Sequence, residues 1–78
     1  MPEPASNIRF LREWQKISQE YMAQRLGISQ PAYSKLESGK TRVKITYLHT
    51  IAEILQCSAA DLVDKTREEL MKEQLDSR

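Results

Sequence analysis

Polar side chains that can form hydrogen bonds recur through one short stretch in the middle of the chain, residues 29–39. The stretch carries the amide of Gln30, the hydroxyls of Ser34 and Ser38, and the ammonium group of Lys35. Amide and ammonium groups can bond to the edges of bases, and hydroxyl and ammonium groups can bond to phosphate oxygens. These residue types therefore suit contact with a nucleic acid, provided that other parts of the chain hold them outward.

The same stretch has the markers of a short helix with defined ends. Ser29 has the chemistry of an N-cap, because its hydroxyl can accept from a backbone N–H that the first turn leaves unpaired. Pro31 falls in the first turn, where a missing N–H costs nothing. Gly39 follows the last helical residue, where a left-handed backbone favours glycine. Only three residues inside this helix are expected to face a core: Ala32, Tyr33 and Leu36.

Basic charge gathers around this helix. Residues 1–56 contain eight Lys or Arg against five Asp or Glu, whereas residues 57–78 contain four against six. Between Arg25 and Lys44 there are five basic residues and a single acidic one, Glu37. Such a distribution suits a polyanionic partner, although on charge alone a solvated surface of mixed charge fits equally well.

Length and composition exclude several classes of protein. The 78 residues, 40% of them apolar and 29% charged, are those of one ordinary globular domain. No apolar run could span a membrane, and residues 1–4 are too polar for a signal peptide, so we expect a cytoplasmic protein. With one cysteine, Cys57, and one histidine, His49, the chain has no internal disulfide and no metal cluster. Since there is also no glycine-rich phosphate loop and no nucleophile with a plausible base, we expect no enzymatic activity, cofactor or small-molecule ligand.

The apolar spacing and the turn residues predict an all-α fold of five or six short helices. We expect a first helix over about 7–16, capped by Ser6, and a second over about 19–26, capped by Ser18. Only Ile28 lies between the glycine that ends the second helix and the cap of the third. So tight a turn makes the two helices cross steeply, which is the helix-turn-helix arrangement.

Three further helical segments follow. A basic loop at 40–44 precedes a helix over about 45–56. Its expected inward stripe, at spacings of three and four residues, is Ile45, Leu48, Ile51, Ala52 and Leu55. A capping box at Ser58 starts a fifth helix, and a second one at Thr66 starts a tail helix over about 67–75.

Four pieces of the sequence, in their order and spacing, resemble a known family. They are Ile8-x-x-Leu11-Arg12, Ser18-Gln19-x-x-x-Ala23-x-x-Leu26-Gly27-Ile28-Ser29, Lys35-Leu36-Glu37-x-Gly39-Lys40, and Leu48-x-x-Ile51-Ala52-x-x-Leu55. Together they resemble the phage-repressor and Cro-type helix-turn-helix family, often called XRE-like. The resemblance implies one lambda-repressor-like domain over 1–78, with a core over about 7–63 and a helical tail at 64–78.

The resemblance also implies a function: sequence-specific binding of double-stranded DNA by a transcriptional regulator, with the third helix in the major groove. The residues that we expect at the DNA are Gln19, Ser29, Gln30, Pro31, Ser34, Lys35, Ser38, Lys40, Thr41 and Arg42. By this resemblance Gln19 touches phosphate, four residues (Gln30, Pro31, Ser34 and Lys35) read bases, and the three in the loop hold the DNA backbone. Glutamine can pair with adenine and lysine favours guanine, whereas Pro31 can offer only an apolar contact.

A structural ion pair between Arg12 and Glu37 is a further implication of the resemblance. It would tie the first helix to the end of the third. The residues themselves agree, because Glu37 is the lone acid of a basic stretch and needs a cation nearby.

A homodimer is expected from apolar residues beyond those that a small core requires. They are Ile54, Leu62, Val63, Leu70, Met71 and Leu75. A second interpretation fits the same residues, in which the tail folds back and completes the core of a monomer. Two other functions also fit the sequence: an antitoxin whose DNA-binding domain holds a toxin partner, and a protein-interaction module on the same fold.

Overall fold

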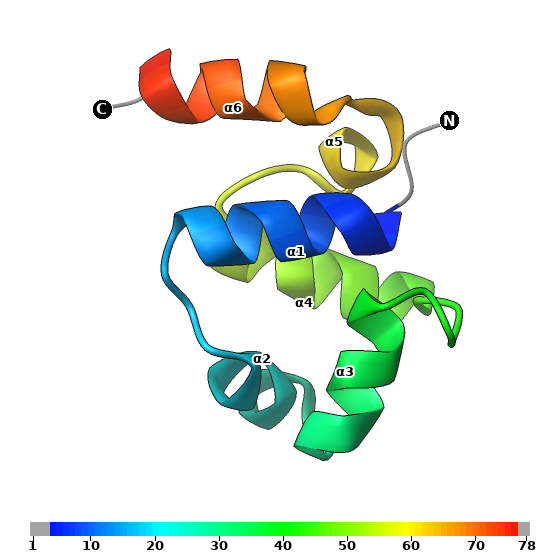
Figure 1. Cartoon of the computed structure of the whole chain (residues 1–78). Helices are drawn as coiled ribbons and strands as arrows, with labels where there is room; N and C mark the ends of the chain where they lie inside the picture. The colour runs from blue at the N-terminus through cyan, green and yellow to red at the C-terminus, as the bar shows by residue number, and fades with distance from the viewer. Residues whose placement is uncertain (1–3, 77–78) are drawn as a thin grey trace.

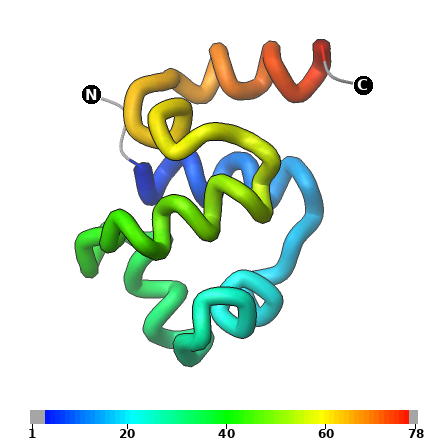
Figure 2. The backbone as a smooth tube through the Cα atoms, turned by 180° about the vertical axis from the view of Figure 1, so that it is seen from behind, coloured from blue at the N-terminus to red at the C-terminus, as the bar shows by residue number. Residues whose placement is uncertain are grey.

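Six α-helices and no strand form the part of the chain that the computed structural model describes, residues 4–76 (Figure 1). They are α1 (Pro4–Trp14), α2 (Gln19–Leu26), α3 (Gln30–Glu37), α4 (Ile45–Leu55), α5 (Ala59–Asp64) and α6 (Arg67–Asp76). In both views α1 and α4 cross the middle of the molecule, with α5 and α6 on one side and α2 and α3 on the other (Figures 1 and 2). The all-α prediction is therefore confirmed.

Three serine N-caps form as the sequence predicted. The hydroxyl oxygen of Ser18 accepts from the backbone N–H of Tyr21 at 3.0 Å, and that of Ser29 accepts from Ala32 at 3.2 Å. Ser58 does the same for α5 at 3.0 Å. Each hydroxyl satisfies one backbone donor that the first helical turn leaves unpaired, and so fixes where its helix begins.

The first helix differs from its prediction at both ends. It begins at Pro4, because proline has the backbone angle of a first-turn residue and lacks only an N–H that would be unpaired there. Ser6 therefore lies inside the helix and is not its cap; its hydroxyl accepts from Arg67 instead. The helix ends at Trp14, and Lys16 follows it in a left-handed conformation with φ of 58°.

The core lies where α1, α2, α3, α4 and α5 meet. Its fully enclosed large side chains include Ile8, Leu11, Met22, Tyr33, Ile51 and Leu55. Two expected core positions are wrong: Ala32 is exposed, and Ile45 is 69% exposed. Both lie in the first turn of a short helix, where the apolar spacing continues but no neighbouring element covers the side chain.

The C-terminal helix folds back onto α1 and completes the core of a single chain. Leu62 and Leu70 are 0% and 1% exposed, so neither is available to a second copy, and their assignment to a dimer interface is wrong. The turn between α5 and α6 is fixed by the buried amide of Asn7, whose Nδ2 donates to the carbonyls of Leu62 and Lys65 at 2.8 Å. Gln15, directly after α1, adds a hydrogen bond from its side-chain amide to the carbonyl of Leu55 at 2.9 Å.

Candidate nucleic-acid interface

The turn between α2 and α3 consists of three residues, Gly27, Ile28 and Ser29, and the first two are hydrogen-bonded to α2. Gly27 adopts φ of 70°, a left-handed conformation that costs glycine little. The backbone N–H of Gly27 donates to the carbonyl of Gln24 at 3.1 Å, and that of Ile28 to the carbonyl of Ala23 at 3.0 Å. The chain therefore leaves α2 at a fixed angle, and α3 crosses α2 steeply (Figures 1 and 2).

One side of α3 anchors the helix and the other is open. Tyr33, Leu36 and Glu37 are buried, at 0%, 5% and 5% exposure. The predicted base-reading residues lie on the open side: Gln30, Pro31 and Lys35 are exposed, and Ser34 is half-buried. Ser29 and Ser38, at the two ends of the helix, are also exposed.

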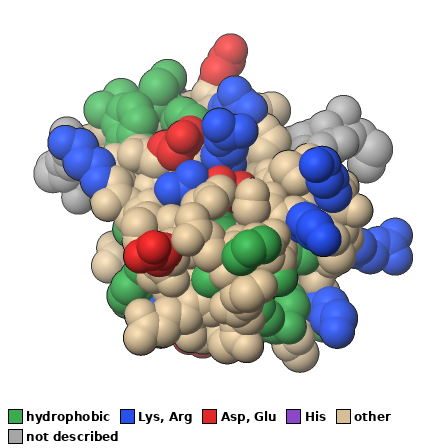
Figure 3. Space-filling model, turned by 60° about the horizontal axis from the view of Figure 1, so that its bottom comes forward, with side chains coloured by type: hydrophobic (Ala, Val, Ile, Leu, Met, Phe, Trp, Pro, Cys, Tyr) green, Lys and Arg blue, Asp and Glu red, His purple; other side chains and the backbone are tan. Residues whose placement is uncertain are grey.

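The basic loop after α3 is attached to the last turn of that helix by one carbonyl group. The carbonyl of Lys35 accepts from the backbone N–H groups of Lys40 and Thr41, at 3.0 and 3.3 Å, and from the hydroxyl of Ser38 at 3.2 Å. Lys40, Thr41 and Arg42 are exposed. The view of this side of the molecule shows several Lys and Arg side chains gathered together (Figure 3).

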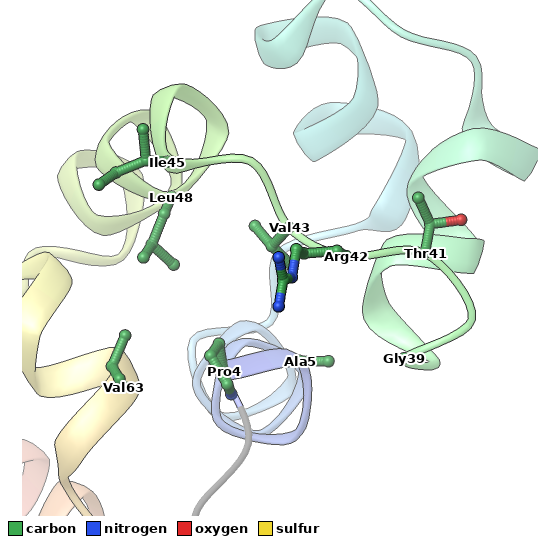
Figure 4. Close-up of a pocket in the computed structure, with 9 residues that line it drawn as sticks. All are labelled: Pro4, Ala5, Gly39, Thr41, Arg42, Val43, Ile45, Leu48 and Val63. Carbon is green, nitrogen blue, oxygen red and sulfur yellow. The ribbon is translucent and has the colours of Figure 1, made fainter.

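Behind the loop lies an apolar groove of about 490 Å³ (Figure 4). Its lining includes Val43, Ile45, Leu48 and Val63, and the start of α1. Arg42 extends toward the start of α1 on the groove side of the loop, whereas Thr41 points away from the groove (Figure 4). The groove itself has few hydrogen-bonding groups and does not suit a base or a phosphate.

The ion pair expected between Arg12 and Glu37 is present and bidentate. Arg12 Nε lies 2.8 Å from Glu37 Oε2, and Arg12 Nη2 lies 2.8 Å from Glu37 Oε1. The side chains are only 12% and 2% exposed. Arg12 Nη1 also donates to the carbonyl of Ile17 at 2.7 Å. One guanidinium group therefore joins α1, the α1–α2 connection and the last turn of α3.

Protonation of this pair is set by competing effects on Glu37. Burial alone would raise the pKa of its carboxyl group, but the hydrogen bonds from Arg12, with smaller effects of Tyr33 and Gln19, bring the pKa below its ordinary value. The same hydrogen bonds to Glu37 raise the pKa of the Arg12 guanidinium, which burial alone would lower. Both groups are therefore charged at neutral pH.

The side chain of Gln19, the first residue of α2, contacts this ion pair. Its Nε2 donates to Glu37 Oε1 at 3.2 Å, and its side chain is half-buried. A primary amide has two hydrogens, so one can bond to Glu37 while the other stays available for a ligand. Gln19 thus links the buried carboxylate to the outer surface.

Tyr33 lies in the core, as the sequence predicts, and its hydroxyl is buried together with the ring. The hydroxyl is enclosed, and among the described residues it makes no hydrogen bond of good geometry. Burial, followed by the neighbouring Glu37 carboxylate, raises the pKa of this hydroxyl. An enclosed hydroxyl without a partner lowers stability, so its cost must be offset by the packing of the aromatic ring.

Two comparisons with known proteins agree with this geometry. A family model described as helix-turn-helix matches residues 8–62. The chain belongs to this helix-turn-helix family, of the phage-repressor type. A solved structure of the P22 c2 repressor, in complex with a synthetic operator in the presence of Tl⁺, is similar over 85% of this chain and 100% of that one. The two share 27% of their residues, with a TM-score of 0.74. No curated protein matches the chain.

Within residues 4–76 of this helix-turn-helix protein, no three His, Cys, Asp or Glu side chains are grouped so that they could hold a metal ion. Nor does any described helix have the length and apolar character needed to cross a bilayer.

Proposed function

We propose that this protein is a transcription regulator without enzymatic activity that binds double-stranded DNA through α3 in the major groove. The observation that carries the proposal is the contrast between the two sides of α3. Three buried residues, Tyr33, Leu36 and Glu37, fix the helix, while the polar side chains opposite them make no contribution to the core. A helix anchored on one side can present the other to base edges without moving.

Base reading is assigned to the two outward side chains with the most suitable chemistry. The Gln30 amide has both a donor and an acceptor, which match N6 and N7 of adenine. The Lys35 ammonium group can donate to O6 and N7 of guanine. Pro31 contributes an apolar surface that suits the methyl group of thymine.

Phosphate contacts are assigned to the loop that follows α3 and to the start of α2. Lys40 and Arg42 supply charge, and Thr41 supplies a hydroxyl. Because the loop is bonded to the carbonyl of Lys35, its phosphate contacts keep a fixed position relative to the base-reading residues. The similar P22 c2 repressor has been solved in complex with a synthetic operator, which supports DNA binding by this fold.

Binding as a homodimer to two half-sites is part of the proposal. Four of the six apolar residues that favour a dimer keep exposed surface: Ile54 is half-buried, and Val63, Met71 and Leu75 are 40%, 38% and 52% exposed. Two copies related by a two-fold axis would present their α3 helices to successive turns of the major groove.

The experiment that tests the proposal is selection of bound duplexes from a random DNA pool, followed by titration of the selected duplex and a scrambled one. A palindromic selected sequence supports both base reading and the dimer. The Lys35→Ala variant should lose affinity mainly for the selected duplex, and Arg42→Ala should lose it for both. Failure of the wild-type protein to bind any duplex at low salt would refute the proposal.

A further inference from the structure

The apolar groove behind the loop has the size and the lining of a small-molecule site (Figure 4). Its volume of about 490 Å³ lies within the range of about 300–1,000 Å³ that such sites have. Two of its apolar side chains are open to water, since Ile45 is 69% exposed and Val63 is 40% exposed. Leu48 lies between them (Figure 4). Apolar side chains left uncovered in one concave place mark a binding surface.

The groove exists only in the folded chain. Its lining comes from the start of α1, the loop after α3, the first turns of α4, and Val63 of α5. No sequence pattern joins these segments, which is why no small-molecule ligand is expected from the sequence.

The charge of the groove comes from Arg42, the one charged residue among the described residues that line it. Its side chain extends toward the start of α1 on the groove side of the loop (Figure 4). Within residues 4–76 no carboxylate forms an ion pair with this guanidinium group. Thr41, whose hydroxyl could also form hydrogen bonds, points away from the groove (Figure 4). The groove therefore combines an apolar surface with one cation that has no carboxylate partner there.

We propose that the groove binds an apolar carboxylic acid. Its hydrocarbon part covers Ile45, Leu48 and Val63, and its carboxylate pairs with Arg42. A guanidinium group can donate to both oxygens of a carboxylate in one plane, which fixes the orientation of the ligand. A neutral apolar molecule would leave the cation without a partner, and a small anion would leave the apolar side chains in water. A molecule with both parts matches the charge and the apolar surface together.

Such a ligand competes with DNA, and this part of the inference rests on the proposed function. There Arg42 contacts a phosphate, and one guanidinium group cannot hold a phosphate and the carboxylate of the ligand at the same time. The acid therefore lowers the affinity for DNA, and DNA lowers the affinity for the acid by the same factor. The groove thus makes DNA binding sensitive to the concentration of the acid.

The first test is titration of the isotope-labelled protein with decanoate, followed by the NMR shifts of backbone amides. Saturable shifts should appear at residues of the groove, among them Val43, Ile45 and Val63. Acetate, which has the charge without the chain, should cause none. Decan-1-ol, which has the chain without the charge, should bind about threefold to tenfold more weakly than decanoate. Shifts spread evenly over the molecule, or equal affinities for decanoate and decan-1-ol, would overturn the site.

Matched variants test the two parts of the site separately. Ile45→Gln should lower the affinity for decanoate about fourfold or more, because at least one methylene group loses its apolar contact. Tyr21→Gln changes a side chain on α2 that is 43% exposed and does not line the groove, so it should have no effect. Arg42→Gln should lower the affinity for decanoate to that for decan-1-ol. Thermal unfolding checks that each variant keeps the fold, and equal effects of Ile45→Gln and Tyr21→Gln would overturn the site.

The second test measures DNA binding with saturating decanoate, or with acetate at the same concentration so that ionic strength is constant. Decanoate should lower the affinity for the selected duplex and for a scrambled duplex about fivefold, equally because a phosphate contact carries no sequence information. It should also reduce the slope of log K against log salt by about 0.9, the contribution of one phosphate contact. The Arg42→Ala protein should show neither change.

The possible results distinguish the inference from the function on which it rests. Decanoate that binds in the groove without changing the affinity for DNA would overturn the competition. Groove amides that shift on dilution without any ligand, together with sedimentation of a dimer, would assign the groove to a second copy and overturn the ligand site. If the wild type binds neither duplex, the proposed function fails and the competition fails with it, whereas the decanoate titration decides independently whether the groove holds an acid.

Discussion

Replacement of Arg12 by alanine should destabilise the fold more than any exposed substitution. The substitution removes the cation from a carboxylate that is only 2% exposed and leaves the Ile17 carbonyl without its donor. Breaking a buried pair by removing one partner costs about 3–5 kcal/mol. A chain of 78 residues has a total stability of about 4–12 kcal/mol, so the loss is a large fraction of the whole.

The size of this effect can be worked into a measurable shift. For a domain of this length each kcal/mol changes the melting temperature by about 4–8 °C, so a loss of about 3 kcal/mol should lower it by about 12–24 °C. Urea unfolding followed by circular dichroism measures the free energy directly, and the fluorescence of Trp14 gives a second probe of the same transition.

A double variant distinguishes an unpaired charge from lost packing. Arg12→Met with Glu37→Leu removes both charges and keeps most of the volume, so it should be more stable than Arg12→Ala alone. An Arg12→Ala protein that melts like the wild type would refute the assignment of the pair as the anchor of α3. A double variant less stable than Arg12→Ala would also refute this assignment, because the loss of stability would then come from packing and not from an unpaired charge.

Acid titration gives an independent test of the same pair. Because the pKa of Glu37 is lower in the folded protein than its ordinary value of 4.5, its contribution to stability is complete above pH 4.5. That contribution is lost as the pH falls through the folded-state pKa. Stability of the wild type should therefore decrease below pH 4.5, and Glu37→Gln should show a shallower decrease.

Three further predictions test other features. In urea unfolding, Lys16→Gly should have a free energy of unfolding about 1 kcal/mol higher than that of Lys16→Ala, because φ of 58° is strained for a residue with a Cβ atom. Leu70→Ala should cost about 2–5 kcal/mol in the same assay, since the residue is 1% exposed, whereas Leu75→Ala at 52% exposure should change stability by less than about 0.5 kcal/mol; equal effects would contradict the fold-back of α6. Burial raises the pKa of Cys57 to about 11, so its alkylation by iodoacetamide at pH 8 should be far slower than that of free cysteine, and equal rates would contradict the burial.

Local signals in the sequence were sufficient to predict the helices around the surface proposed to face DNA. Ser18, Ser29 and Gly27 act on backbone groups within four residues of themselves, so their types alone predicted the ends of α2 and the start of α3. The first helix was placed too late because Ser6 and Pro4 are both good N-terminal residues. Only the contact of Ser6 with Arg67, far along the chain, distinguishes them.

Contacts distant in the sequence account for the other errors. The side chain of Asn7 donates hydrogen bonds to backbone carbonyls 55 and 58 residues away. Because every residue has a backbone carbonyl, no sequence pattern predicts which ones Asn7 contacts. The burial of Leu62 and Leu70 follows from the fold-back that Asn7 helps to fix. The Arg12–Glu37 pair, in contrast, was predictable, because the resemblance to a family supplied the partner that spacing alone could not.

The attachment of the loop to the carbonyl of Lys35 has a consequence for how this protein can change over generations. The bonds that join the loop to α3 come from backbone groups and from Ser38, and none uses the side chains of Gln30, Pro31 or Lys35. Those three side chains are also exposed and lie outside the core. Under the proposed function, new residues at these positions would alter the preferred DNA sequence without changing the fold or the contacts of the loop with the DNA backbone. Under this arrangement, duplicated copies of the gene could diverge in their targets through a few substitutions, each with little cost in stability.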